Sequence, residues 1–152
     1  LLLIQWVAEE VYHNSHYNYK EVAYLLEIDE DVTQPNQEEE KEIPFMELLA
    51  NADLSKGKKV FGKCKACHKL GDGENGTGPH LYNIIDREIA VISDFKYSSS
   101  FKALNGNWTY DELNQFLTKP SNYVKGTAMN FAGLGKISDR ANLIAYLEDS
   151  TK

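Results

Sequence analysis

The sequence predicts an all-α domain with three main helices and long loops. Apolar residues recur at helical spacing in three stretches, which follow Asp53, Thr109 and Ser138. The segments between these stretches are rich in Gly, Asn and Ser and contain no alternating strand pattern of useful length. A hydrophobic content of 42% over 152 residues supports one core and leaves room for an appendage.

Charge separates the appendage from the domain. Residues 1–51 carry 2 lysines and 12 acidic residues, a net charge of −10, whereas residues 52–152 carry 14 Lys and Arg against 11 acidic residues, a net charge of +3. Low hydrophobicity and like charge predict an extended acidic spacer over residues 14–44, followed by a folded domain over residues 45–152. The alternative is an acidic arm docked on the basic domain. No basic stripe indicates nucleic-acid binding.

The chain begins with an apolar run. In LLLIQWVA only Gln5 is polar, but the run is far shorter than the ~20 residues that cross a bilayer. Aromatic residues, among them Trp6, Tyr12 and Tyr17, gather where the run ends, as they do at the end of a spanning helix. We therefore expect residues 1–13 to be the end of a membrane anchor. A buried or amphipathic helix start is the alternative.

The first main helix is expected to follow a short apolar lead-in, PFMELLANAD. Asp53 can cap this helix, which runs to about Cys64 with Val60 and Phe61 turned inward and the lysines at positions 56, 58, 59 and 63 turned outward. Gly57 costs a helix interior ~1 kcal/mol relative to alanine. We expect that it is used for close contact with another helix.

The other two main helices have their own start signals. Thr109 and Glu112 form a T-x-x-E capping box, and the helix that they start ends before Pro120. Its apolar face is expected to consist of Leu113, Phe116 and Leu117. Ser138 is expected to cap the last helix, which runs to about Glu148.

Cys64, Cys67 and His68 form a CKACH motif, which is typical of covalent haem attachment. Two thiols at this spacing can form thioethers with the two vinyl groups of one haem, and the adjacent imidazole can bind the iron. The alternatives are a redox-active dithiol, half of a zinc site and a structural disulfide. A zinc site would need further ligands, and the sequence has no other cysteine and no HxxxH pair. A thioredoxin-like dithiol would need a βαβ setting, which the sequence does not predict.

Beyond this motif, the order of the segments resembles class I cytochrome c. The matching segments cover about residues 45–150 and include CKACH, TGP, FKYSSS, NGNWTYDEL, KPSNYVKGTAMNFAGL and DRANLIAYL. The acidic spacer and apolar start are similar to those of the membrane-anchored cytochromes c of alphaproteobacteria. The resemblance implies the small class I cytochrome c fold, wrapped around one covalent haem. It also implies a close helix crossing, with Gly57 and Phe61 against Leu143 and Tyr146.

The resemblance implies one haem c, attached through Cys64 and Cys67, with His68 and Met129 as the iron ligands. A neutral thioether favours ferrous iron, so a His/Met pair raises the reduction potential and leaves no open position for oxygen. Met46, the other methionine, is expected to be a packing residue.

Further positions are implied around the haem. The carbonyl of Pro79 is expected to accept the second ring N–H of His68, and Gly78 is expected to let the backbone approach the haem. The groups implied near a haem propionate are the charge-offsetting Arg87 and the hydrogen-bonding Tyr97, Trp108 and Thr127. For Trp108 the alternative is a core aromatic with its N–H satisfied elsewhere. The residues implied to wall the haem are Leu81, Leu113, Leu117 and Phe131.

Two positions depart from the family pattern. Phe116 stands where mitochondrial relatives usually place a tyrosine near the methionine ligand. The family's lysine ring around the haem edge is thin, because only four lysines remain, Lys63, Lys119, Lys125 and Lys136. Matching or adjacent sites hold the uncharged Ser121, Asn122, Ala128 and Gly135. His80 is expected to be a surface or hydrogen-bonding histidine rather than an iron ligand.

The resemblance implies an electron-transfer protein rather than an enzyme. It would carry single electrons from a cytochrome bc-type complex to a terminal cytochrome c oxidase in a respiratory chain. Its N-terminus would anchor it in a bacterial inner membrane, with the cytochrome domain in the periplasm. Two alternatives remain: a haem enzyme or sensor acting on peroxide or a diatomic gas, and a fixed subunit of a larger respiratory assembly. The first needs an open distal site, against which Met129 argues.

Overall fold

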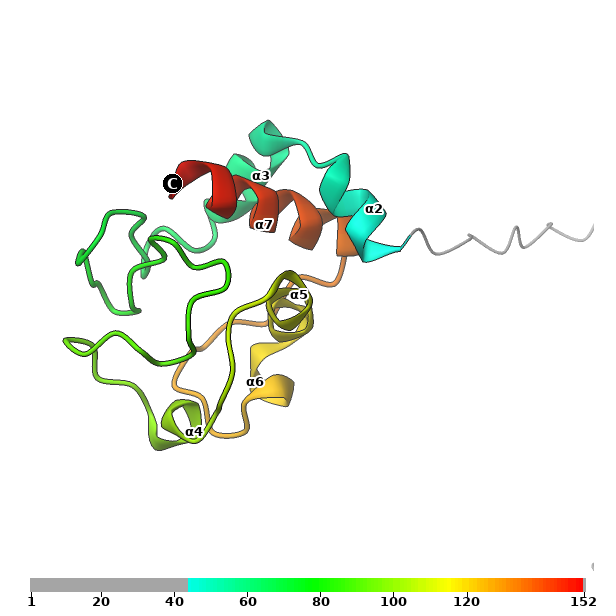
Figure 1. Ribbon diagram of the computed structural model, residues 1–152. Coiled ribbons are helices and arrows are strands. Elements are labelled where there is room, and N and C mark those ends of the chain that lie inside the picture. Colours follow the sequence, from blue (N-terminus) through cyan, green and yellow to red (C-terminus); the bar gives the residue numbers. More distant parts are fainter. Residues whose placement is uncertain (1–43, 152) are drawn as a thin grey trace, which may run out of the picture. The chain divides into compact units, whose positions relative to one another are not determined.

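The computed structural model describes residues 44–151, so the predicted anchor (1–13) and nearly all of the predicted spacer (14–44) lie outside the described residues. In chain order the described helices are α2 (Phe45–Ala50), α3 (Leu54–Phe61), α4 (Ser99–Lys102), α5 (Tyr110–Thr118), α6 (Pro120–Tyr123) and α7 (Ile137–Ser150) (Figure 1). Outside these helices, the only β-like feature of the described residues is an isolated bridge between Glu88 and Asn107. The predicted all-α class is therefore confirmed.

Helix α3 begins where the sequence predicts. The side chain of Asp53 accepts the Lys56 N–H at 3.0 Å and so caps the helix. Regular helix ends at Phe61, and turns continue the chain through the CKACH motif, with the Cys64 N–H bonded to the Phe61 carbonyl at 2.8 Å. The four lysines that we expected to point outward, 56, 58, 59 and 63, are all exposed.

Helices α3 and α7 cross closely at Gly57, as predicted. A Cβ at Gly57 would lie only 2.6 Å from the Cβ of Tyr146 and would also overlap the carbonyl oxygen of Asn142. The rings of Phe61 and Tyr146 pack 5.7 Å apart, and the Asp53 N–H donates to Asn142 Oδ1 at 2.7 Å. The crossing therefore has no room for a side chain at position 57.

The start of α5 agrees with the sequence in part. Thr109 Oγ1 accepts the Glu112 N–H at 3.2 Å, and the helix ends at Thr118, before Pro120. The second half of the capping box does not form: the Thr109 N–H donates to Asn107, and Glu112 Oε2 is buried without a partner among the described residues. The predicted apolar face is buried as expected, with its members being Leu113, Phe116 and Leu117.

The prediction that Ser138 caps the last helix is wrong. Helix α7 begins at Ile137 and has no side-chain cap, so Ser138 lies inside its first turn. The reason is that the Arg140 N–H already bonds to the Lys136 carbonyl at 3.3 Å, which starts the helical ladder earlier than the capping signal indicates.

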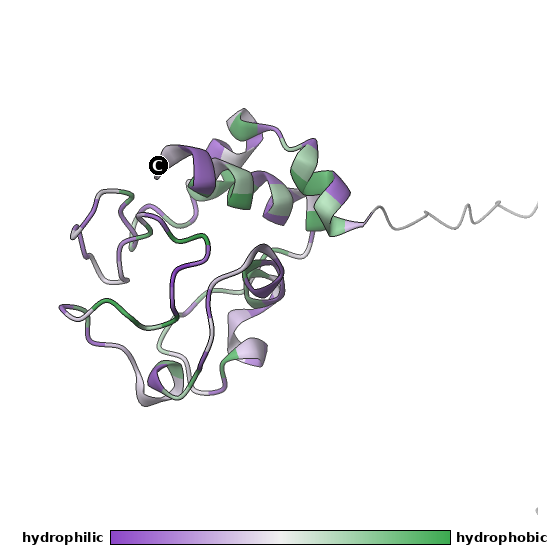
Figure 2. Ribbon diagram, in the orientation of Figure 1, coloured by the Kyte–Doolittle hydropathy of each residue, from purple (hydrophilic) through white to green (hydrophobic). Residues whose placement is uncertain are grey.

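The core lies where α2, α3, α5 and α7 meet. Figure 2 shows hydrophobic and hydrophilic residues alternating along these helices, as in helices that are buried on one side. Leu143 and Ile144 of α7 are almost completely buried. Helix α2 packs through Phe45, whereas Met46, which we expected to pack, is 52% exposed. Within the described range, no helix combines the length and apolarity needed to cross a bilayer.

Candidate cofactor site

One cavity of about 410 Å³ lies between the CKACH turns, the loops after them, and the segment around Met129. Its lining is mostly apolar, and its size is in the range of roughly 300–1,000 Å³ that is usual for cofactor sites. Every residue that the sequence analysis assigned to the site lies on its wall: Cys64, Cys67, His68, Gly78, Pro79, Leu81, Arg87, Tyr97, Trp108, Leu113, Leu117, Thr127, Met129 and Phe131.

Sequence reasoning missed several apolar members of this wall. They are Ile84, Phe95, Phe101, Leu143 and Leu147. Two of them come from α7, where helical periodicity placed them in the core without indicating that this part of the core also faces the cavity. Phe116 also lines the cavity and packs against Trp108 with ring centroids 4.9 Å apart. Core and cofactor wall are therefore the same set of side chains over much of the site.

The two thiols lie on one wall of the cavity. Cys64 is partly buried, Cys67 is exposed, and both are free. Burial raises the pKa of the Cys64 thiol, and the charge of Lys63 opposes this shift in part. Both cysteines line the same cavity as His68.

The ring of His68 is held by the main chain. Its Nδ1 lies 2.7 Å from the carbonyl oxygen of Pro79, and because a carbonyl only accepts, Nδ1 carries the hydrogen. Burial lowers the pKa of His68, while the bond to Pro79 acts in the opposite direction. The neutral ring then has its lone pair on Nε2, the form that binds metals. A Cβ at Gly78 would overlap the His68 ring, so only glycine fits beside it.

Met129 lies on the wall of the same cavity as His68. The Met129 N–H donates to Thr127 Oγ1 at 3.1 Å, and its carbonyl accepts the Phe131 N–H at 3.1 Å. The side chains of Met129 and Phe131 are partly buried against the core. A thioether and an imidazole from distant parts of the sequence thus share one apolar cavity.

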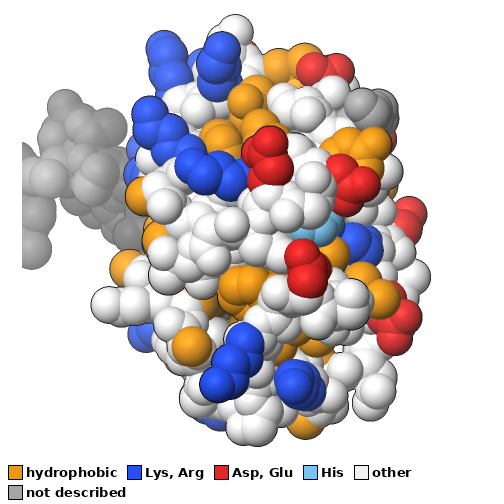
Figure 3. All heavy atoms as spheres, turned by 90° about the vertical axis from the view of Figure 1, so that its left-hand side faces the viewer, with side chains coloured by type: hydrophobic (Ala, Val, Ile, Leu, Met, Phe, Trp, Pro, Cys, Tyr) orange, Lys and Arg blue, Asp and Glu red, His pale blue; other side chains and the backbone are white. Residues whose placement is uncertain are grey.

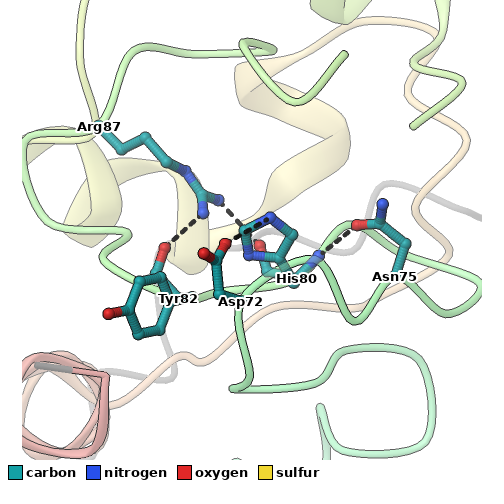
Figure 4. A network of polar contacts seen from close by, with 5 residues as sticks. All are labelled: Asp72, Asn75, His80, Tyr82 and Arg87. Carbon is teal, nitrogen blue, oxygen red and sulfur yellow. Dashed lines mark hydrogen bonds and ion pairs between the residues drawn. The ribbon is translucent and has the colours of Figure 1, made fainter. Parts of the chain in front are cut away.

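Arg87 joins the cavity to a polar network (Figure 4). Its guanidinium donates to the carbonyl oxygens of Tyr82 at 2.6 Å and His80 at 2.9 Å. Burial lowers the pKa of Arg87, although Tyr97 and Asp72 favour its charged form. This partly buried cation, with Tyr97, Trp108 and Thr127 on the same wall, suits an anionic group inside the cavity.

His80 belongs to this network rather than to the cavity wall. It is buried, its N–H donates to Asn75 Oδ1 at 3.0 Å, and its Nε2 lies 3.9 Å from Asp72 Oδ1. The expected surface position is therefore wrong, and the hydrogen bonds of His80 are made by its main chain: among the described residues its ring Nδ1 is buried without a hydrogen-bond partner.

The donor set fits haem c. Two thiols, an imidazole and a thioether line one apolar cavity, which is the ligand chemistry of a covalently attached haem with His/Met ligation. The close approach of Gly78 to His68 also agrees with a site built for a flat ring system, because a side chain there would displace the imidazole.

Comparisons with known proteins place this site in a family. The sequence model of the cytochrome c family matches residues 54–151, so the chain belongs to the cytochrome c family, and its fold and motifs are those of class I. Helix α2 lies outside the matched residues. Membership establishes an electron carrier with one haem c, bound covalently through Cys64 and Cys67.

Relatives from alphaproteobacteria match this chain over segments of different length. A cytochrome c homolog of Rickettsia bellii is 40% identical over 130 residues, which cover 85% of this chain and 75% of the relative. Cytochrome c-type cyt cy of Rhodobacter capsulatus is 49% identical over 96 residues, which cover 62% of this chain and 48% of the relative. Cytochrome cH from Methylobacterium extorquens has a similar fold, with a TM-score of 0.61 and 31% identity over 64% of this chain and 99% of its own.

Proposed function

We propose that the protein carries single electrons from a cytochrome bc-type complex to a terminal cytochrome c oxidase, with His68 and Met129 as the residues that would bind the iron of its haem. The observation that supports this most directly is that both side chains line one mostly apolar cavity together with Cys64 and Cys67. Haem c supplies one reversible Fe(III)/Fe(II) couple when bound. The protein's own contribution is to hold, orient and shield it.

His68 and Met129 divide this work. The Pro79 carbonyl fixes the orientation and tautomer of His68, which keeps its other nitrogen available for the metal. Met129 would supply a soft, neutral thioether ligand, which favours the ferrous state. With Met129 in this role, no position on the iron would be left open, which argues against the alternative function, a haem enzyme or sensor of peroxide or a diatomic gas.

The remaining wall makes the site apolar and balances its charge. Leu81, Leu113, Leu117 and Phe131 give the cavity an apolar wall, and an apolar wall around a haem would reduce the solvent rearrangement that accompanies a change of charge. Arg87 supplies a positive charge on the same wall. These side chains hold one geometry without any bond being made or broken in the protein.

The ligand assignment is tested by the spectrum of the ferric holoprotein. We expect a low-spin, six-coordinate spectrum with the near-infrared band of methionine-ligated ferric haem. Met129→Ala should remove this band and open the distal site, whereas Met46→Ala should leave it unchanged because Met46 is exposed on α2. A high-spin wild-type spectrum at neutral pH, or an unchanged spectrum in Met129→Ala, would contradict the assignment.

The route of the electron is supported by charge and by the predicted tether. Figure 3 shows lysines and arginines on the loop face in separate groups, with acidic and uncharged side chains between them. The four lysines of the predicted ring are exposed, but so are the uncharged Ser121, Asn122, Ala128 and Gly135. Steering of association by charge, which can raise rates by roughly 10–10³-fold, should therefore be weak here.

A tether compensates for weak steering. We propose that residues 1–13 are the end of an N-terminal anchor in the bacterial inner membrane and that the acidic residues 14–44 form a spacer, with the cytochrome domain, 45–152, in the periplasm. A short flexible linker gives effective concentrations that reach roughly the millimolar range, so a tethered carrier needs little long-range attraction. This arrangement is similar in composition to membrane-anchored cytochromes c.

Flash-induced haem oxidation in membranes tests the route and the tether together. Electron transfer by the full chain should depend little on ionic strength, and removal of residues 1–42 should slow it strongly at matched overall concentration. A full-length control with Glu38, Glu39 and Glu40 changed to Gln separates spacer charge from tethering, and it should stay close to wild type. Equal rates for the truncated and full chains at physiological salt would contradict the tether. Stoichiometric co-purification with the oxidase in mild detergent would instead favour a fixed subunit.

A further inference from the structure

The segment that carries Met129 is attached to the domain mainly at its ends. We define the Met129 segment as residues 127–135. Within the described part of the chain, the hydrogen bonds of residues 128–133 stay inside the segment and join Met129 to Thr127 and to Phe131. The main chain of this stretch thus gains no hydrogen-bonded support from neighbouring elements. Its position depends on how firmly the two ends are held.

The C-terminal end of the segment is fastened to α5. The Leu134 N–H donates to the Leu117 carbonyl at 2.8 Å. Gly133, which has a φ of +98°, lies so close to Thr118 that a Cβ would overlap the Thr118 carbonyl oxygen. A side chain at this position would both strain the backbone and push the segment away from α5.

Arg140 of α7 provides the second fastening. Its side chain is buried, and Nη1 donates to the carbonyl oxygens of Leu134 at 2.6 Å and Gly135 at 3.0 Å. Its Nε donates to Asn114 Oδ1 of α5 at 2.6 Å. The guanidinium of Arg140 on α7 therefore bonds to both the Met129 segment and α5. A planar group with several N–H donors can make these bonds at the same time.

The charge of Arg140 is not used in an ion pair. Among the described residues its partners are two carbonyl oxygens and one amide oxygen, and no carboxylate lies within salt-bridge distance. Burial lowers the pKa of Arg140, so burying this cation opposes its ionisation. Burying a charge that pairs only with main-chain and amide oxygens costs free energy and therefore contributes little to the stability of the fold. The feature of Arg140 that no smaller side chain would reproduce is the geometry of its guanidinium donors, not its charge.

We propose that Arg140 is a positioning residue that holds the Met129 segment against the cavity and so keeps Met129 on the iron. This inference rests on the proposed function, because it takes Met129 as the distal ligand. Release of the Leu134 and Gly135 carbonyls removes one of the two fastenings at this end and leaves only the bond from the Leu134 N–H to α5, so a segment without main-chain support between residues 128 and 133 is held less firmly. The Met-dissociated state then becomes more populated, and any external ligand that binds this state gains apparent affinity by the same factor.

Imidazole titration of the ferric full-length holoprotein measures that population. Imidazole binds the iron only when Met129 has left, and the near-infrared methionine band reports the exchange. We expect Arg140→Lys, which keeps the charge but loses the planar group, to bind imidazole about tenfold more tightly than wild type, equivalent to ~1.4 kcal/mol. Asn114→Ala, which removes one of the three partners and leaves both carbonyl contacts, should have a smaller effect of about threefold.

A matched control separates positioning from general stability. Thr151 is buried just past the C-terminal end of α7 and donates to the Leu147 carbonyl at 2.6 Å, away from the Met129 segment. Thr151→Val should lower the denaturation midpoint while leaving imidazole affinity within about twofold of wild type. If Arg140→Lys binds imidazole as wild type does, or if Thr151→Val strengthens imidazole binding as much as Arg140→Lys, the proposal is overturned. Met129→Ala tests the distal ligand separately: if its spectrum matches wild type, the proposed function fails, whatever Arg140 does.

Discussion

The helical side of the domain and its loop side are held together by different interactions. The helical side consists of α2, α3, α5 and α7. Side-chain packing holds it together, because Gly57 lets α3 and α7 approach closely and Leu143 and Ile144 are almost fully buried. The loop side consists of residues 62–107, where α4 is the one helix described. There, polar side chains bond to the main chain of other loop residues, as Arg87 does with Tyr82 and His80.

Backbone conformation differs between the two sides as well. Within residues 44–151, the non-glycine residues with positive φ are all on the loop side, namely Asn83, Asp86 and Ala90. Such conformations persist only where surrounding contacts over-determine them. The helical side is therefore stabilised by close packing. The loop side includes strained backbone, which lowers stability, and it places Arg87, Tyr97 and Pro79, the partner of His68, around one cavity.

The largest expected effect is at the helix crossing. Gly57→Ala should lower the free energy of unfolding by about 3 kcal/mol, because the new Cβ would overlap the Asn142 carbonyl and press on Tyr146. Chemical denaturation of the holoprotein measures this loss. Gly135→Ala is the control, since a Cβ there meets nothing within 4 Å, and its effect should stay within about 0.5 kcal/mol. Equal effects of the two variants would show that close packing does not distinguish the helical side.

On the loop side, Arg87→Gln should cost less stability but change the redox behaviour. The Tyr82 and His80 carbonyls lose charged donors, which should lower stability by about 2 kcal/mol. Removal of a positive charge from the cavity wall favours the ferric form, so the reduction potential should fall. Voltammetry compares this variant with Lys102→Gln, the same charge change on exposed α4. A similar fall in Lys102→Gln would mean that net charge, not position, sets the shift.

The smallest effect concerns the strained backbone. Ala90 has a φ of +59°, a conformation that costs an L-residue roughly 1–2 kcal/mol, which glycine avoids. Glycine also loses more chain entropy on folding, by about 0.4–1 kcal/mol, so Ala90→Gly should raise stability by about 0.5–1 kcal/mol. Asn83→Gly should change it less, because asparagine tolerates this region. A less stable Ala90→Gly protein would show that the Ala90 methyl contributes packing that outweighs the strain.

The same division explains what the sequence could predict. The caps at Asp53 and Thr109 were predictable because each involves residues three apart in the chain. The Ser138 cap was wrong because α7 starts earlier in the structure, at Ile137. Only half of the capping box of Thr109 and Glu112 forms, because the Thr109 N–H donates to the Asn107 carbonyl and not to the Glu112 side chain.

The cavity wall could be predicted only with the help of the family. CKACH is a local signal, but nothing in the local sequence connects His68 with Met129 or Arg87 with Tyr97, which the fold brings to one cavity from distant positions. Ile84 and Phe95 were missed because an apolar residue in an irregular loop has no periodicity that indicates its direction, and Phe101 was missed because α4 is only four residues long. The burial of His80 likewise follows from contacts with Asn75 and Arg87 that no local pattern encodes.

Membership in the cytochrome c family makes this protein an electron carrier, and we propose that Met129 is a ligand of its haem iron. Voltammetry of the full-length holoprotein tests this proposal most directly, first under argon and then with oxygen or hydrogen peroxide. We predict one reversible one-electron wave whose shape and current are unchanged by either oxidant, because the proposed Met129 ligand would leave no open position on the iron for them. A catalytic current that grows with peroxide or oxygen concentration in the wild-type protein, at neutral pH and with the methionine band intact, would contradict the account.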